Sequence, residues 1–317
     1  MAETSALPNS ITRKERLITL PLFLVISVLF LYAFSLWESP LYPFWYGCDA
    51  SFFSMCGRGI TEGWVPYLDF FDLKGPCFFF LQAIGQLIHR DRLGIFLLEI
   101  PFLWSSLILM WEIARIFVNR LKAASILLIV LFMHVATLWG GNTLEEYMLP
   151  LSLLVLFLTL KAVLRKNTQP ETPDAFCLDF GRISAWTAVL TGICFAIIAF
   201  SKITVAAPIA GVVIAVCLND LLDKNYRALF RYLGFSLLGI AIVVLPLLLY
   251  FGRFHAISRM LYCVFSFAFK RSVDFSEPFN MEWETKLFGA TFAFLFALFH
   301  PKRLGRPMQI LILSMSA

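Results

Sequence analysis

The sequence is poor in charged residues and lacks the short motifs of several large protein classes. Charged residues make up 15% of the 317 positions and apolar residues 60%. A soluble domain carries roughly 25% and 45–50% of these two kinds. The chain contains no phosphate-binding P-loop and no glycine pattern of a dinucleotide-binding fold. With a mean hydropathy of +0.80, these features argue against a soluble enzyme, a nucleic-acid-binding domain and a disordered chain.

Cysteine usage predicts no zinc site. The seven cysteines are scattered, no pair has CxxC spacing, and no His lies at a zinc-finger offset. Their odd number leaves at least one thiol outside any disulfide. Cys48 and Cys56 form a disulfide only if their loop faces an oxidising compartment, and two free thiols are the alternative.

Long apolar runs recur along the chain and predict an all-α, polytopic bundle of transmembrane helices. The run at 76–88 holds only about 13 residues, which is typical of an interfacial or re-entrant segment. A further run begins near 307, so the sequence reads as truncated at its C-terminus. The predicted spans are 17–37, 93–118, 123–139, 148–164, 184–200, 203–222, 229–251 and 287–299.

The distribution of Lys and Arg predicts the orientation of these spans. If 76–88 does not cross, more than half of the 26 Lys and Arg residues fall on one side, which the positive-inside rule assigns to the cytoplasm. The chain is then a multi-pass protein of the plasma or inner membrane, with residues 1–16 cytoplasmic and 17–317 forming the membrane module. The predicted cytoplasmic linker is 165–183, and the predicted outer loops are 38–92, 140–147 and 252–286.

The first outer loop begins with an acidic residue, Asp49, ahead of a moderately amphipathic segment at 51–61. That segment predicts a juxtamembrane helix with Arg58 facing water. Asp49 stands where a helix N-cap would stand. Two interpretations of Asp49 follow, a helix cap on a surface loop or a carboxylate held at the height of the lipid headgroups.

Later in the same loop, two carboxylates and one amine lie close together in sequence. Asp69 and Asp72 are three residues apart, so a helical turn would place them on one face. Lys74 follows two residues later and is able to neutralise them. An ordinary solvated acidic loop is the alternative.

The run from Gly63 to Pro76, Gly-Trp-Val-Pro-Tyr-Leu-Asp-Phe-Phe-Asp-Leu-Lys-Gly-Pro, resembles the first-loop signature of the GT-C glycosyltransferases. More narrowly, it is similar to bacterial relatives of the protein O-mannosyltransferases and the lipid A aminoarabinose transferases. In these families an Asp follows the first helix, and a basic residue with prolines comes later in the loop. Asp49 and Lys74-Gly75-Pro76 take these two places, with Gly75 standing where proline is usual.

The resemblance implies an inverting transfer of a sugar from a polyprenyl-phosphate donor to an acceptor on the outer face of the membrane. The acceptor is a protein, a lipid or a glycan of the cell envelope. Asp49 would be the general base, which a single-displacement mechanism requires. A cation would stabilise the leaving phosphate, and Lys74 is the first candidate, with Arg58 and Lys202 behind it. A snorkelling lysine at a helix end is the alternative for Lys202.

Further acidic residues are candidates for contact with the acceptor or with a metal. Glu99 lies within the predicted span 93–118, where ionisable groups are expensive. Glu145 and Glu146 lie in the outer turn at 140–147, and a solvated acidic turn is their alternative interpretation. Together with Asp69 and Asp72 they are compatible with a divalent metal, although the sequence demands no cofactor. Nothing in the sequence predicts a nucleic-acid partner.

Two other functions compete with the transferase. A transporter or flippase would concentrate its charged residues at mid-membrane and show paired halves with interrupted helices. In this sequence the charges gather at the predicted outer surface instead. A transferase-like membrane protein without catalytic activity is the other alternative, and the early end of the sequence favours it.

Overall fold

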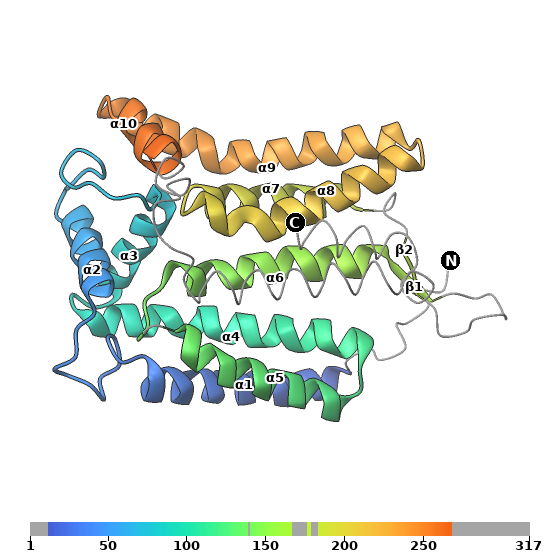
Figure 1. Ribbon diagram of the computed structural model, residues 1–317, viewed down its shortest axis with the longest axis horizontal. Coiled ribbons are helices and arrows are strands. Elements are labelled where there is room, and N and C mark those ends of the chain that lie inside the picture. The colour runs from blue at the N-terminus through green and yellow to red at the C-terminus, as the bar shows by residue number, and fades with distance from the viewer. Residues whose placement is uncertain (1–11, 139, 167–175, 179–182, 268–317) are drawn as a thin grey trace, which may run out of the picture.

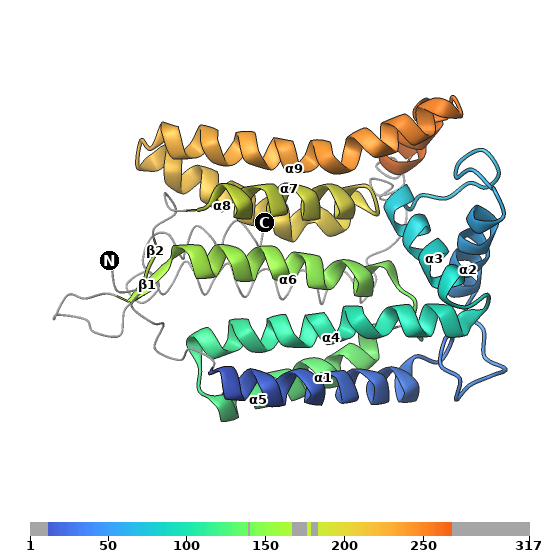
Figure 2. The same ribbon diagram turned by 180° about the vertical axis from the view of Figure 1, so that it is seen from behind.

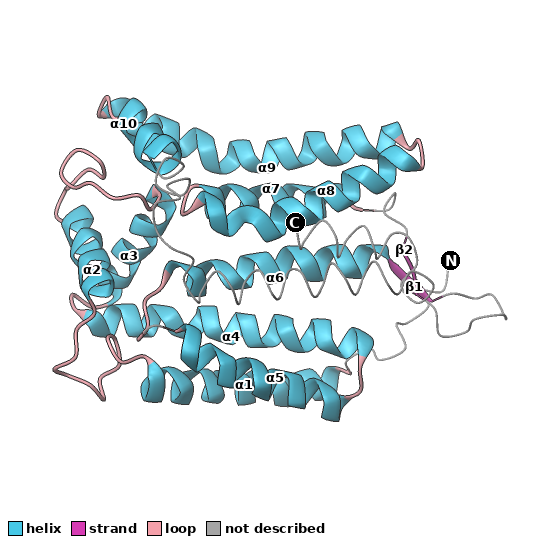
Figure 3. Cartoon of the chain, viewed as in Figure 1, coloured by secondary structure: helices cyan, strands magenta, loops and turns pink. Residues whose placement is uncertain are grey.

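The computed structural model describes residues 12–138, 140–166, 176–178 and 183–267, and helices dominate this part of the chain (Figures 1 and 3). The only strands among these residues are two of three residues each, β1 (Leu164–Lys166) and β2 (Phe176–Leu178), which pair antiparallel. The predicted helical architecture is therefore confirmed. The helices are α1 (Arg13–Phe34), α2 (Cys48–Thr61), α3 (Pro76–Ile88), α4 (Arg92–Phe117), α5 (Arg120–Thr137), α6 (Leu144–Val163), α7 (Ala185–Ala199), the 3-10 turn η2 (Ile203–Ala206), α8 (Ala207–Leu222), α9 (Tyr226–Arg253), α10 (Ile257–Leu261) and the π-turn η3 (Tyr262–Phe267).

Five helical segments are long and apolar enough to cross a membrane. This finding suggests a membrane protein, as the composition predicted. The predicted span at 184–200 is a helix of 15 residues, shorter than the about 20 residues that a bilayer requires. The predicted span 287–299, the run near 307 and the C-terminal end lie outside the described residues. The five segments are α1, α4, α6, Ile203–Leu222 and α9.

Helix α1 begins earlier than the hydropathy pattern predicted. The side chain of Thr12 caps it by accepting a hydrogen bond from the backbone N–H of Glu15, so the charged residues at 13–16 belong to the helix. The charged residues of this first turn tie α1 to α4 and α5. The ion pairs are Arg16–Glu112 at 2.9 Å, Glu15–Arg115 at 3.3 Å and Glu15–Arg120 at 2.8 Å.

Two glycines bring α7 and α9 into close contact. A Cβ atom on Gly192 would lie 1.9 Å from the carbonyl oxygen of Ser236, and one on Gly239 would lie 2.1 Å from that of Val189. Small residues allow helix backbones to approach one another in this way, as at many membrane helix interfaces. Helices α7 and α9 consequently pack closely against each other along one side of the bundle, seen at the top of Figures 1 and 2.

The described helices bury two main apolar cores. One forms where α1, α4 and α5 meet, and it includes Leu107 and Trp111. The other lies between α6, α7 and α8 and extends to the short helices α2 and α3 through Phe53, Phe78 and Phe79. The short helices are thus packed on the bundle and belong to its fold.

Helices α2, α3 and α10 gather at one end of the bundle, whereas β1 and β2 lie at the opposite end (Figure 1). Helix α3 lies at that end and packs on α2, and its 13 residues are fewer than the about 20 that a bilayer requires. Two predicted loops contain secondary structure. Strand β1 overlaps the start of the predicted linker 165–183 and pairs with β2 inside it, and the predicted outer loop 252–286 begins with helical turns that end at Phe267. The remainder of that outer loop, 268–286, lies outside the described residues.

Candidate functional site

The first turn of α2 carries Asp49, and this residue does not cap the helix. Gly47 is the N-cap, no side chain caps this end, and Cys48 is already helical. The helix therefore begins three residues before the predicted segment 51–61, and the cap interpretation of Asp49 is wrong. The side chain of Asp49 is 74% exposed, at the end of the bundle where α2 and α3 lie.

Lys74 joins two of the predicted acids. Its Nζ atom lies 3.9 Å from Oδ2 of Asp49 and 3.8 Å from Oδ1 of Asp72. The same amine sits 4.7 Å from the ring centre of Phe53, within reach of a cation–π interaction. The amine of Lys74 therefore lies within ion-pair distance of two carboxylates, that of Asp49, which is exposed, and that of Asp72, which is largely buried. We call Asp49, Asp72 and Lys74 the first-loop triad.

The backbone around Lys74 is held by side chains of its own loop. Its N–H donates to Oδ1 of Asp72 at 2.7 Å, and its carbonyl accepts from the hydroxyl of Tyr67 at 2.8 Å. Tyr67 is buried against Phe251 of α9 and has a φ of 67°, in the left-handed region. Residues other than glycine rarely adopt a φ in this region. Packing on α9 therefore holds the loop in an unusual turn that positions Lys74.

Gly75 accounts for the departure from the expected proline. Its N–H donates to the carbonyl oxygen of Ser201 at 2.6 Å, a bond that proline has no hydrogen to make. A Cβ atom on Gly75 would lie 1.9 Å from the carbonyl oxygen of Phe200. Glycine is therefore the residue that lets the first loop lie against the end of α7.

This contact brings the backbone of Lys202 close to that of Lys74, because the two lysines are the chain neighbours of Ser201 and Gly75. Lys202 follows Ser201 directly, and its Nζ atom lies 2.6 Å from Oε1 of Glu145 at the start of α6. Both side chains of this pair are about half exposed. Glu145 also lines a hollow of about 290 Å³ whose other walls are mostly apolar side chains of α6 and α8, Leu153 and Val212 among them.

Two predicted site residues do not join the triad. Arg58 pairs with Glu62 at 3.1 Å near the far end of α2 and is 56% exposed. Its side chain is exposed, and its ion pair is made with Glu62 and not with a residue of the triad. Asp69 accepts a hydrogen bond from the backbone N–H of Val65 at 2.6 Å. The helical face that Asp69 and Asp72 were expected to share does not exist, because turns and loop fill the stretch from 62 to 75.

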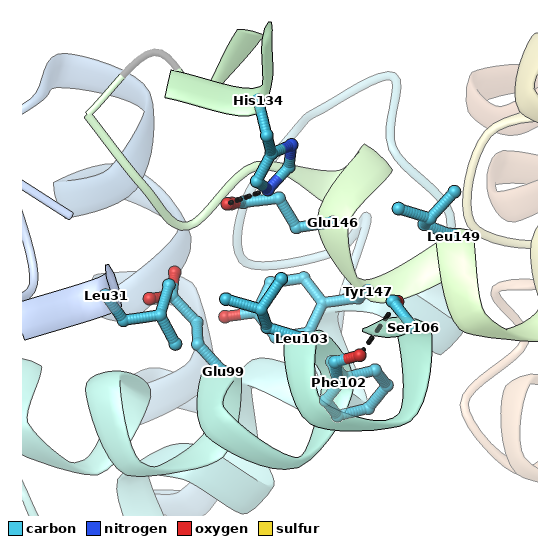
Figure 4. Close-up of a pocket in the computed structure, with 9 residues that line it drawn as sticks. All are labelled: Leu31, Glu99, Phe102, Leu103, Ser106, His134, Glu146, Tyr147 and Leu149. Atoms are coloured by element: carbon cyan, nitrogen blue, oxygen red, sulfur yellow. Dashed lines mark hydrogen bonds and ion pairs between the residues drawn. The ribbon is translucent and has the colours of Figure 1, made fainter. Parts of the chain in front are cut away.

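Glu99 is buried and Glu146 is largely buried, with 11% of its side chain exposed, in contrast to the exposed Glu145. Glu99 and Glu146 both line a cavity of about 10 Å³, and Figure 4 shows them beside Tyr147. Glu146 forms a capping box with Thr143 at the start of α6, and its Oε1 lies 3.8 Å from Nε2 of His134. The interpretation of Glu145 and Glu146 as a solvated pair is therefore wrong for Glu146. The backbone N–H of Asn142 and the hydroxyl of Ser35 donate to Glu99.

Asn142 is the centre of a buried polar network that sequence reasoning missed. Its side chain and that of Gln82 exchange hydrogen bonds at 2.7 and 3.2 Å, and the hydroxyl of Tyr147 donates to its Oδ1 at 2.9 Å. Its Nδ2 also lies 3.3 Å from Glu38 and 3.3 Å from the carbonyl oxygen of Ala50. A glutamine inside the apolar run 76–88 was the available sequence signal for this network.

Six of the cysteines are free thiols, namely Cys48, Cys56, Cys77, Cys194, Cys217 and Cys263. Cys48 is exposed and Cys56 is buried on the same helix, eight positions apart. That spacing is about 12 Å along a helix, beyond the reach of a disulfide. The open alternative is thereby decided in favour of free thiols. Burial raises the pKa of the Cys56 thiol to about 12, which keeps it protonated and unreactive.

Among the described residues, no group of three or more His, Cys, Asp or Glu side chains is arranged to hold a metal ion. The triad is instead a compact set of two carboxylates and one amine at a surface. No family model, curated protein or solved structure matches this chain. The resemblance of the first loop to the GT-C glycosyltransferases therefore stays a prediction.

Proposed function

We propose that the protein is a membrane glycosyltransferase that moves a sugar from a polyprenyl-phosphate donor to an acceptor, with inversion at the anomeric carbon. The observation that carries the proposal is the position of Lys74 between Asp49 and Asp72. The general base and the phosphate-binding cation that the reaction needs are thereby neighbours at one end of the bundle.

Asp49 has the exposure that a general base requires. Its carboxylate removes a proton from the nucleophilic atom of the acceptor as that atom bonds to the anomeric carbon. The bond between this carbon and the lipid phosphate breaks at the same time, and its electron pair stays on the phosphate oxygen. A single displacement of this kind needs one base and no covalent enzyme intermediate.

The charges of the site limit how the donor binds. The triad has one more carboxylate than amines, and Lys202 is matched by Glu145. A donor phosphate therefore binds by replacing a carboxylate at one of the two lysines, or it brings a divalent cation with it. The apolar hollow beside Glu145 is suited to part of a prenyl chain.

The test is turnover of radiolabelled polyprenyl-phosphate sugars by the purified chain in detergent, in the presence of membrane extracts as the acceptor source. Wild-type protein should release lipid phosphate, and the Asp49→Asn variant should lose at least a hundredfold in rate while still binding the donor. Glu62→Gln, which changes an exposed acid just after α2, is the matched control and should keep full rate. Equal turnover by Asp49→Asn and wild type would contradict the proposal.

Proton-linked transport is the second candidate function, and it is favoured by the buried carboxyl groups of Glu38 and Glu99 and the largely buried one of Glu146. Ionisable groups at membrane depth often mark a transport path. Uptake of prenyl-phosphate sugars into proteoliposomes under a proton gradient, with no release of lipid phosphate, would support transport over transfer.

A further inference from the structure

Glu38 occupies an unusual position for an acidic residue. It lies in the loop between α1 and α2, yet only 2% of it is exposed. Its Oε1 accepts one hydrogen bond, from Nδ2 of Asn142 at 3.3 Å. Its Oε2 is buried and has no hydrogen-bond partner in the described part of the chain. An ionised carboxylate is costly in such a place, whereas a neutral carboxyl group costs much less.

The charged and titratable groups around Glu38 give its carboxylate little support. Carboxyl groups of Glu99 on α4, Glu146 on α6 and Asp91 before α4 oppose its ionisation. The neighbouring cation is Arg92, whose guanidinium already donates to the carbonyl of Trp45 at 2.9 Å and covers the ring of Tyr46. On α5, His134 lies against Glu146. Burial is the main cause that raises the pKa of Glu38 to about 8.

The hydrogen bonds of Asn142 connect this carboxyl group to α2. The amide nitrogen of Asn142 has two hydrogens but three acceptors within 3.3 Å, on Glu38, Gln82 and the backbone of Ala50. Ala50 is next to Asp49 in the first turn of α2. Since a charged acceptor binds a donor about twice as strongly as a neutral one, a carboxylate at position 38 draws the amide away from Ala50.

We propose that Glu38 is a protonation latch: its neutral carboxyl group leaves Asn142 bonded to Ala50 and holds the first turn of α2, and its ionisation releases that turn. The latch connects proton concentration to the segment that carries Asp49. It applies to α2 whatever reaction the protein performs, so it goes beyond the proposed transferase function. Release of the turn leaves the rest of the bundle intact, because the face of α2 that packs on α3 is apolar.

A cysteine placed at the contact itself tests the latch. Ala50 is 1% exposed, so the introduced thiol of the full-length Ala50→Cys protein reacts with a maleimide only when the first turn opens. Cys48, exposed in the same turn, is the internal reference, and both labels are located by peptide mass spectrometry. The ratio of the two rates is measured from pH 6.5 to 9.5, with and without the Glu38→Gln substitution.

We expect this ratio to rise at least fivefold across the pH range with Glu38 present, relative to the Glu38→Gln background. The Glu62→Gln substitution, which changes an exposed acid, should leave the rise unchanged. The same rise in both the Glu38 and the Glu38→Gln proteins would overturn the proposal. No sugar donor is present, so this outcome is independent of whether the transferase proposal holds.

Hydrogen exchange of the unmodified protein gives a second test that needs no folded variant. The amides of residues 52–56 should lose protection between pH 7 and pH 9 after correction for intrinsic exchange rates. The amides of α9 serve as the reference and should keep theirs. Constant protection of 52–56 over this range would overturn the latch even if Glu38→Gln failed to fold.

Discussion

The Nζ atom of Lys74 lies 3.9 Å from Oδ2 of Asp49, which joins two parts of the first loop that the sequence separates. The contact depends on α2, which presents Asp49, and on the turn at Tyr67, which presents Lys74. Each residue was predicted to have its own role, and the structure makes them neighbours. Loss of either charge should therefore change the environment of the other.

Replacement of Lys74 by methionine should weaken binding of a polyprenyl phosphate. The variant keeps an apolar side chain over Phe53 but loses the amine that faces Asp49 and Asp72. A hydrogen bond to a charged group contributes enough that its loss should lower affinity roughly ten- to a hundredfold. Lys122→Gln, a change to an exposed lysine of α5, is the control and should bind like wild type. Equal binding by Lys74→Met would exclude Lys74 as the phosphate-binding residue.

Substitution of Gly75 by alanine should destabilise the fold. The new Cβ atom would lie 1.9 Å from a backbone oxygen of Phe200, which is not a flexible neighbour. Overpacking of this kind costs about 1–3 kcal/mol, measured as a lower midpoint of thermal unfolding in detergent. Gly234→Ala is the matched control, because nothing lies within 4 Å of its added atom and α9 is helical there. That control should be neutral or stabilising by up to about 1 kcal/mol.

The spans were the easiest part of the fold to predict. Hydropathy located α4 and α9 well, because uninterrupted apolar runs of bilayer length are typical of membrane helices and rare in soluble domains. It gave no warning that the apolar run at 184–200 forms a helix of only 15 residues. The close packing of α7 on α9 at two glycines could not be predicted, because composition gives no information about which helices lie side by side.

The site was predicted in part, for a related reason. Asp49 and Lys74 stood out because the motif around them resembles a known signature. The shared face of Asp69 and Asp72 was wrong, because the left-handed φ of Tyr67 and the hydrogen bond from Val65 to Asp69 turn the chain. Glu38 is the first residue of the predicted outer loop 38–92, and its burial follows from a long-range contact. The N–H of Trp37 donates to the carbonyl of Gly140 and folds the loop back onto the bundle.

Removal of the Tyr67 hydroxyl should affect the site more than the fold. Tyr67→Phe loses one hydrogen bond, to the carbonyl of Lys74, at a cost of about 0.5–1.5 kcal/mol. Tyr42→Phe loses a comparable bond, to the carbonyl of Ala33 at 2.7 Å, and should lower stability by a similar amount. Turnover of the donor should fall in Tyr67→Phe alone. Equal turnover in the two variants would show that the turn at Tyr67 does not position Lys74.

The stability of the protein should depend on pH through Glu38. Its pKa is about 8 in the folded protein, compared with 4.5 for an ordinary glutamate. Between these two values the folded state binds more protons than the unfolded state, so the free energy of unfolding falls as pH rises. The contribution is complete below pH 4.5 and is lost as pH rises through about 8. Thermal unfolding midpoints in detergent, measured from pH 5 to 9, should therefore decline.

Glu38→Gln should reduce the slope of that decline, because its side chain cannot ionise. Glu62→Gln is the appropriate comparison, since the pair that Glu62 forms with Arg58 is exposed and surface pairs contribute little. Its midpoints should follow those of wild type over the whole range. If Glu38→Gln and wild type decline in parallel, the pH dependence arises from groups other than Glu38. A reduced slope in Glu38→Gln alone would show that the buried carboxyl group of the first loop links the fold to proton concentration near neutrality.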